Sequence, residues 1–139
     1  MILLDTNVVS ELMRPKPDSS VAAWLAGQPA ANVFLSVITE AELRYGVAIL
    51  PAGQRRDRIA AAVEDMLQKD FARRILPFDS EAACIYAEIG ASRRAAGQPI
   101  SHAACQVAAI ARCRGAAIAT RNVGHFERCG IEVINPWPA

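Results

Sequence analysis

Residues 1–7, Met-Ile-Leu-Leu-Asp-Thr-Asn, decide the fold: a short apolar run ends in a carboxylate, a hydroxyl and an amide. An uninterrupted apolar run of this length is typical of a buried parallel strand. Ligands of open α/β sheets collect beyond the carboxyl ends of such strands. We therefore interpret Asp5 as a functional acid at a strand end. The alternative is that Asp5 only caps the helix that follows.

Apolar runs alternate with helical patterns along the rest of the chain, which predicts an α/β fold with a mostly parallel sheet of about five strands. We expect strands at residues 2–5, 33–35, 75–77, 117–120 and 132–134. We expect helices at residues 7–13, 19–26, 39–50, 55–71, 79–97 and 101–115. Since no linker or repeat divides the pattern, residues 1–139 are expected to form one domain.

Composition narrows the class of protein. Hydrophobic residues make up 53% of the 139 residues, which is enough for a core and excludes general disorder. No apolar run approaches the roughly 20 residues of a membrane-spanning helix. We expect neither a signal peptide nor a membrane segment, and a cytoplasmic location. The four cysteines lack Cys-x-x-Cys spacing, which favours free thiols in a reducing compartment over disulfides or zinc.

The basic side chains are almost all arginine. The net charge is +1, and of the 15 basic residues only Lys16 and Lys69 are lysines. Arginine suits phosphate recognition because its planar fork can bond two oxygens. The alternative is that the arginines reflect a compositional bias. A nearly neutral chain that binds nucleic acid must gather its positive charge on one face.

A second candidate acid lies on a predicted helix in the first half of the chain. Glu40 and Glu42 point in different directions, because they are two positions apart. Glu40 precedes Arg44 by four residues and is expected to form an exposed ion pair. Glu42 shares a stripe with Tyr45 and other apolar residues, where an acid is costly to bury unless it is paired or binds a metal. We therefore select Glu42; the alternative is a partly exposed Glu at the stripe's edge.

A second strand end carries a similar set of polar groups. Thr120 ends the predicted strand at residues 117–120, and Asn122 follows two positions later. Because parallel strands end at the same edge of a sheet, we expect Thr120 and Asn122 to meet Asp5 across a small cleft. Mg²⁺ prefers carboxylate, amide and water oxygens, so this cleft is a candidate metal site. The alternative makes Asn122 a turn residue.

Other site chemistries fit less well. The chain has no phosphate-binding glycine loop and no Gly-x-Ser-x-Gly motif. His102 and His125 are expected at the surface or at a helix cap, and Asp79 as the N-cap of the next helix. Phosphotransfer with Asp5 as the acceptor is a further hypothesis, although Asn7 stands where a haloacid-dehalogenase-like enzyme needs a second Asp.

Several short motifs follow one another along the whole chain. They are Ile-Leu-Leu-Asp-Thr-Asn at 2–7, Ser36…Thr39…Glu42-Leu43…Gly46, Gly-Gln-Pro-Ile at 97–100, Ala-Ala-Ile-Ala at 108–111, Ala-Thr-Arg-Asn at 119–122 and Ile-Asn-Pro-Trp at 134–137. Together they resemble the PIN-domain toxins of bacterial toxin–antitoxin pairs, the VapC-like group and its FitB type. The resemblance covers essentially the whole chain.

This resemblance implies an α/β/α sandwich and an endoribonuclease that depends on Mg²⁺ or Mn²⁺ and cleaves structured RNA such as tRNA. It also implies a homodimer, and an antitoxin whose own domain binds operator DNA. Asp5 and Glu42 match two metal-site acids of the family. Thr6 and Thr120 match the hydroxyls that support the site, and Asn122 matches a position that the family fills with Asp or Asn.

The chain departs from the family pattern at Ala104, where the family usually has an Asp. A methyl group cannot bind a cation, and Asn122 is neutral, so Asp5 and Glu42 are the remaining charged ligands. We therefore expect a metal-dependent ribonuclease that is impaired in this chain. The alternative is a non-catalytic module that binds an antitoxin and takes part in operon repression. The Ala is either an engineered inactivation or a natural loss.

Two predicted helices offer apolar side chains beyond the needs of one small core. These are Trp24 and Leu25 on the helix expected at residues 19–26, and Tyr45 and Ile49 on the helix expected at residues 39–50. We expect this surface to form a dimer interface. The alternative is ordinary core packing.

Overall fold

Five short apolar segments form one sheet in which every strand runs parallel to its neighbours. The structure is a computed structural model that describes residues 1–138. The strands are β1 (Ile2–Leu4), β2 (Val33–Ser36), β3 (Ile75–Leu76), β4 (Ala117–Ala119) and β5 (Val133–Ile134), in the order β3-β2-β1-β4-β5. The predicted parallel sheet of about five strands is confirmed, with β1 at its centre.

Helices connect consecutive strands. Within residues 1–138 the α-helices are α1 (Thr6–Leu12), α2 (Ser19–Ala26), α3 (Val37–Ala48), α4 (Gln54–Asp65), α5 (Ser80–Ala95) and α6 (His102–Arg114). Shorter helical segments are η1 (Ala30–Asn32), the π-helical η2 (Met66–Asp70) and η3 (Val123–Phe126).

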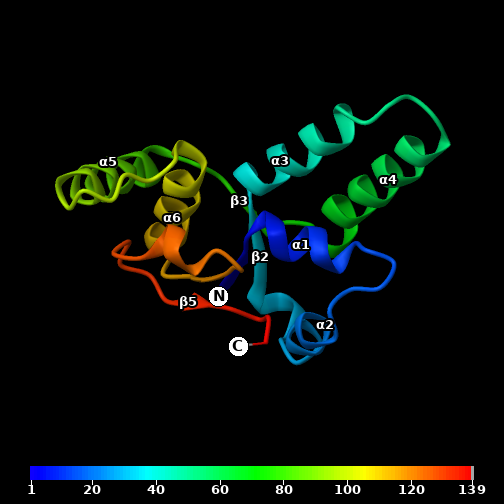
Figure 1. The fold of residues 1–139 in the computed structure, drawn as a ribbon, viewed down its shortest axis with the longest axis horizontal. Coiled ribbons are helices and arrows are strands. Elements are labelled where there is room, and N and C mark those ends of the chain that lie inside the picture. The colour runs from blue at the N-terminus through cyan, green and yellow to red at the C-terminus, as the bar shows by residue number, and fades with distance from the viewer. Residues whose placement is uncertain (139) are drawn as a thin grey trace.

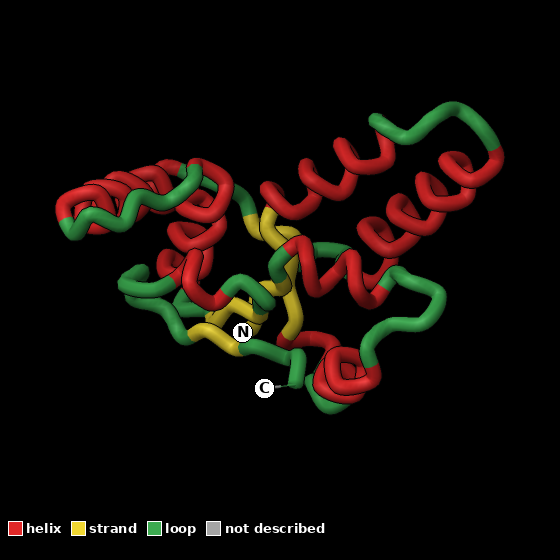
Figure 2. Tube along the Cα trace, in the orientation of Figure 1, coloured by secondary structure: helices red, strands yellow, loops and turns green. Residues whose placement is uncertain are grey.

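Helices cover both faces of the sheet because successive strand residues point to opposite sides and both sides are apolar. Leu3 and Ile118 pack into a core that includes residues of α5 and α6. Ile2, Leu4 and Ala119 pack into a second core with residues of α1, α2, α3 and α4. Figure 1 shows α5 and α6 on one side of the sheet and the antiparallel pair α3 and α4 on the other, and Figure 2 shows the layers from the same direction. The predicted α/β/α sandwich is confirmed.

Local hydrogen bonds explain where two helices begin. Ser36 caps α3 by accepting a hydrogen bond from the Thr39 amide at 3.1 Å, so this helix begins at Val37 rather than at residue 39. Asp79 accepts a hydrogen bond from the Ala82 amide at 3.0 Å, which confirms its predicted role as the N-cap of α5. The helix expected at residues 55–71 is regular only to Asp65 and continues as the π-helical η2.

The four cysteines are free, as expected, and two of them, Cys105 and Cys129, are buried. Burial raises the pKa of both thiols, so both are held in the neutral, less reactive form. Among the described helices, none combines the length and the apolar character needed to cross a membrane.

The predicted apolar surface divides into two parts. Trp24 and Leu25 of α2 pack partly against the core, as ordinary packing requires. Tyr45 and Ile49, near the end of α3, are 67% and 63% exposed. A homodimer through this surface stays a prediction.

Two glycines that occupy different backbone conformations give a matched test of the fold. We expect Gly115→Ala to lower the free energy of unfolding by about 1 kcal/mol, because Gly115 has a φ of 68° where α6 ends. We expect Gly46→Ala to raise it by about 0.5–1 kcal/mol, because alanine favours the interior of a helix. A Cβ at either position meets no other atom within 4 Å, so packing contributes to neither change. Urea denaturation measures both; a shift of the same sign for both variants contradicts the assigned conformations.

Candidate functional site

The carboxylate of Asp5 lies where β1 ends, and three donors hold it. Its Oδ1 accepts a hydrogen bond from the Thr6 amide at 2.9 Å. Its Oδ2 accepts hydrogen bonds from the Thr120 hydroxyl at 2.8 Å and from the Asn7 amide group at 3.3 Å. Asp5 is therefore both the N-cap of α1 and a member of a polar cluster at the strand ends, so the two interpretations of this residue are compatible.

A second cluster joins the Glu42 carboxylate to the first. The Thr6 hydroxyl donates to Glu42 Oε1 at 2.7 Å and lies 3.3 Å from the buried hydroxyl oxygen of Thr39. Thr39 in turn lies 3.4 Å from the Ser36 hydroxyl. Thr6 thus contacts both acids, through its amide to Asp5 and through its side chain to Glu42.

A cleft of about 680 Å³ opens above these groups, and we call it the acidic cleft. Asp5, Thr6, Glu42, Ala104 and Asn122 all line it. The predicted convergence of the positions numbered 5, 42, 104 and 122 is therefore present. The sixth predicted residue, Thr120, is fully buried and contacts Asp5 and the Asn122 amide (3.0 Å) from beneath.

The reason for selecting Glu42 was wrong, although the position converges with Asp5. The stripe that carries Glu42 is buried only in part: Ile38 packs against the core, whereas Glu42, Tyr45, Gly46 and Ile49 are all exposed. An exposed carboxylate needs no partner to offset burial. The prediction that Glu40 and Arg44 form an exposed pair is confirmed at 2.9 Å.

Several cleft residues did not stand out in the sequence as site residues. Asn7 connects the two strand ends, because its amide group also donates to Thr120 (3.2 Å) and its Oδ1 accepts from the Arg121 amide (3.2 Å). The one feature of the sequence that could have identified Asn7 is its place in the polar run that follows β1. Glu11, Arg14 and Trp137 also line the cleft. No local pattern marked Glu11 or Arg14, whereas Trp137 belongs to the Ile-Asn-Pro-Trp motif at 134–137.

Comparisons with known proteins agree with this geometry. A family model described as "PIN domain" matches residues 2–131. This chain belongs to the PIN-domain family. The domain is 46% identical to the plasmid stability protein StbB of Pseudomonas syringae pv. tomato, with all of both chains covered.

Other relatives of this PIN domain have names that state an activity or a class. It is 43% identical to VapC ribonuclease Y4jK of Sinorhizobium fredii, over 99% of this chain and 98% of the relative. It is 44% identical to toxin FitB of Neisseria gonorrhoeae, over 99% of each chain. Among solved structures, FitAB bound to a DNA fragment matches with a TM-score of 0.95 and 42% identity, over 100% of this chain and 97% of that chain.

The donor atoms of this PIN domain fit a hard divalent cation with few protein ligands. Asp5, Glu42 and Asn122 line the same cleft, and the two carboxylates balance two positive charges. Within residues 1–138, no group of three or more His, Cys, Asp or Glu side chains is arranged to hold a metal. Mg²⁺ suits such a site because it keeps several waters and needs only one or two carboxylates.

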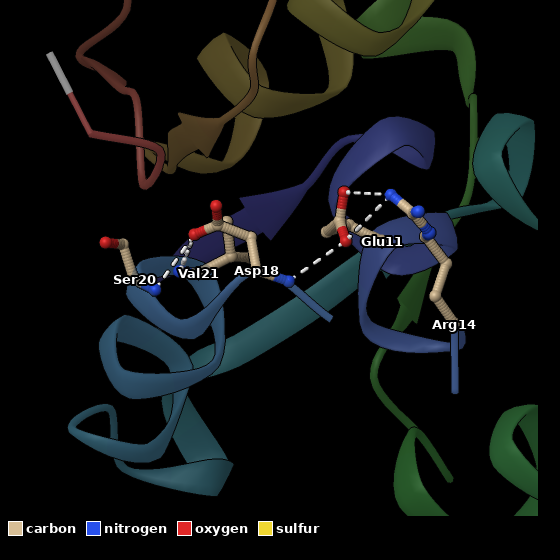
Figure 3. A network of polar contacts seen from close by, with 5 residues as sticks. All are labelled: Glu11, Arg14, Asp18, Ser20 and Val21. Carbon is tan, nitrogen blue, oxygen red and sulfur yellow. Dashed lines mark hydrogen bonds and ion pairs between the residues drawn. The ribbon is translucent and has the colours of Figure 1, made fainter. Parts of the chain in front are cut away.

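A buried acid shapes the wall of the cleft in this PIN domain. The side chain of Glu11 is only 8% exposed, and its two oxygens accept hydrogen bonds from Arg14 at 3.3 and 3.4 Å. Glu11 also accepts a hydrogen bond from the Asp18 amide at 3.1 Å. Figure 3 shows Glu11 between these two donors, with Asp18 capping α2 through Ser20 and Val21. Glu11 therefore ties the segment between α1 and α2 to the cleft.

We expect Glu11→Ala to lower the free energy of unfolding by about 1–3 kcal/mol, because it removes a buried acceptor of several hydrogen bonds. The control is Glu88→Ala, since Glu88 forms only an exposed ion pair with Arg112 at 3.3 Å and contributes little. Urea denaturation followed by circular dichroism measures both variants. Equal effects of the two substitutions contradict a structural role for Glu11.

Proposed function

We propose that this protein is an endoribonuclease toxin of a toxin–antitoxin pair, and that Ala104 weakens its activity. The single observation that carries the proposal is that Thr6 hydrogen-bonds both Asp5 and Glu42 at the mouth of the cleft. Ribonuclease and toxin names among full-length relatives support it. PIN-domain ribonucleases use a divalent metal ion, and the donor set at this cleft fits one.

In this proposal Asp5 and Glu42 hold Mg²⁺ or Mn²⁺, and Asn122 and Thr120 support the bound ion. The ion, when bound, supplies Lewis-acid chemistry to a water and to the RNA phosphate. Asp5 accepts three hydrogen bonds, which leaves one of a carboxylate's roughly four acceptor positions for a ligand. Within residues 1–138, Glu42 accepts one hydrogen bond, from Thr6, so its carboxylate keeps more freedom to adjust.

The supporting residues orient the two acids through hydrogen bonds. Thr120 and Asn7 bind the same oxygen of Asp5, so the carboxylate cannot rotate without losing hydrogen bonds. Thr6 holds Glu42 less firmly, through a single hydrogen bond at 2.7 Å. A fixed carboxylate geometry matters because misplacement of a reacting group by about 1 Å costs roughly 100-fold in rate.

With Ala104, the α6 side of the cleft carries one polar residue, the N-cap Ser101, and no acid. The helix itself does not favour alanine there, because Ala104 is in the first turn of α6, where an acid interacts well with the helix dipole. Ala104 therefore affects the site rather than the fold in this proposal. This side of the cleft then offers the Ser101 hydroxyl but no acid that orients a water or accepts its proton.

The proposal includes partners. The solved structures of FitAB bound to DNA support a cognate antitoxin that carries the DNA-binding domain, so operator DNA contacts the antitoxin rather than this chain. The proposed substrate is RNA, such as a tRNA, and the proposed location of the activity is the cytoplasm. A homodimer of this chain is part of the same proposal.

A second candidate function rests on Ala104. A PIN-fold module without activity would keep the antitoxin-binding surface and act in operon repression. The substitution of Ala104 by an acid distinguishes the two functions, because only a catalytic cleft gains activity from that acid.

We expect Ala104→Asp to raise RNA cleavage by about 100-fold, because the acid restores a ligand and a geometry that the cleft lacks. Cleavage of a tRNA pool in Mg²⁺ or Mn²⁺, without antitoxin, measures the effect, and EDTA is expected to abolish it. The control is Ala104→Asn, which has nearly the same volume but no charge. Absence of cleavage by Ala104→Asp, across tRNA and other RNAs, contradicts the ribonuclease proposal and favours the binding module.

We expect Glu42→Gln to weaken Mn²⁺ binding at least about tenfold, because it removes one of two charged ligands. Glu40→Gln is the matched control, since Glu40 is two residues away and pairs with Arg44 instead of facing the cleft. Electron paramagnetic resonance of free Mn²⁺ measures both without requiring activity. Equal affinities of the two variants would rule Glu42 out as a ligand.

A further inference from the structure

The acidic cleft continues into a second hollow, which we call the side groove. The side groove lies between α1, α3 and α4 and is lined by residues that include Gly46, Arg55, Arg58 and Ile59. The two hollows share Thr6, Ser10, Arg14 and Glu42, so they meet at the candidate site. A bound chain can therefore pass the acids and continue along the side groove.

The side groove carries more positive than negative side chains. The side groove is lined by Arg14, Arg55 and Arg58 and by a single acid, Glu42. Arg55 and Arg58 are exposed, and neither forms an ion pair within residues 1–138. Their guanidinium groups are thus available to an external anion.

Two further arginines are held in place beside the acids. Arg14 lies where the hollows meet, and the buried Glu11 fixes its guanidinium group. Arg121 also lines the cleft and follows β4, on the other side of β1 from β2 and the α3 helix that carries Glu42. Its guanidinium carbon lies 5.2 Å from the centre of the Trp137 ring. A guanidinium group stacked on an indole ring keeps its N–H edges free for phosphate oxygens. Arginines therefore lie on both sides of the Asp5–Glu42 pair.

We infer that a single RNA strand lies along both hollows, with Arg121 binding backbone phosphate on one side of the cleavage point and Arg14, Arg55 and Arg58 on the other. This inference rests on the proposed function and extends it to the path of the substrate. The phosphate that is cleaved lies at the acids, and the neighbouring phosphates lie at the arginines. Arg55 and Arg58 are substrate-binding residues that do not touch the reacting atoms.

The chemistry favours RNA over an acidic peptide. Both polyanions match the arginines, but the side groove runs into the cleft where the proposed function places a phosphodiester, and Mg²⁺ sites with one or two carboxylates typically take substrate phosphates as further ligands. A single strand fits better than a duplex, because Asp5 is half-buried and a flexible strand can bring one phosphate into the cleft. The apolar residues of the side groove, such as Met13 and Ile59, offer contact surface to a base.

Fluorescence anisotropy with a labelled single-stranded RNA of mixed sequence tests the path. The measurements are made in EDTA, so that cleavage does not interfere, and at several salt concentrations. We expect the double variant Arg55→Gln/Arg58→Gln to bind severalfold more weakly at low salt. The slope of log affinity against log salt is expected to fall by about 1.4, since each phosphate contact on a single strand contributes roughly 0.7. Arg121→Gln is expected to lower it by about 0.7.

The matched control is Arg56→Gln/Arg94→Gln, which removes the same charge. Arg56 is on the same helix as the test residues but lines neither hollow, and Arg94 lies on α5. Thermal melting checks that all variants fold. We expect the control pair to leave both affinity and slope unchanged, and a blunt duplex to bind more weakly than the single strand.

An unchanged slope for Arg55→Gln/Arg58→Gln, or an equal loss in the control pair, overturns the inference and assigns these arginines to a protein interface. Equal binding of duplex and single strand overturns the single-strand path. Failure here is distinct from failure of the proposed function. If Ala104→Asp cleaves RNA while the arginine variants bind normally, only the path is wrong; if the arginine variants lose binding while Ala104→Asp is inactive, only the catalytic proposal is wrong.

Discussion

The site depends on one tertiary interaction, the hydrogen bond between the Thr120 hydroxyl and the Asp5 carboxylate at 2.8 Å. It joins residues from opposite ends of the sequence, and it exists because β1 and β4 pair in parallel with Leu4 opposite Ala119. A parallel pair ends at a common edge, so the polar residues after each strand have to meet. A change of register by one residue would move Asp5 away from Thr120 and turn the apolar side chains of β1 to the opposite face.

The polar cluster at this edge is closely connected. Asn7 links the Asp5–Thr120 contact to Arg121, whose backbone amide donates to the Asn7 side chain. Thr6 links the same contact to Glu42, to which its hydroxyl donates. Within residues 1–138, every buried side-chain nitrogen or oxygen has a hydrogen-bond partner. Since hydrogen-bond partners hold both acids before any ligand binds, the cleft is preorganised. The remaining acceptor positions of the two carboxylates are available to a ligand.

The two acids reach the site in different ways, and this explains why one prediction was well founded and the other was not. Asp5 directly follows a strand, so its position could be predicted from the apolar run before it. Glu42 was selected on the assumption that an apolar stripe of α3 is buried, whereas Tyr45 and Ile49 on that stripe are exposed. Periodicity identifies a helical face but not what the face packs against, because α3 leaves the sheet and pairs with α4 (Figure 1).

The sequence by itself determined the local elements and their class. Apolar runs, proline and glycine positions, and capping residues such as Asp79 depend on neighbours a few residues away, so the strands and helices could be predicted to within a few residues. Only the tertiary structure decided which side chains share a cleft. The contact of Asn7 with Thr120, the burial of Glu11 and the stacking of Arg121 on Trp137 each join separate segments. Such contacts follow from strand order and helix packing, which leave no pattern among neighbours in the sequence.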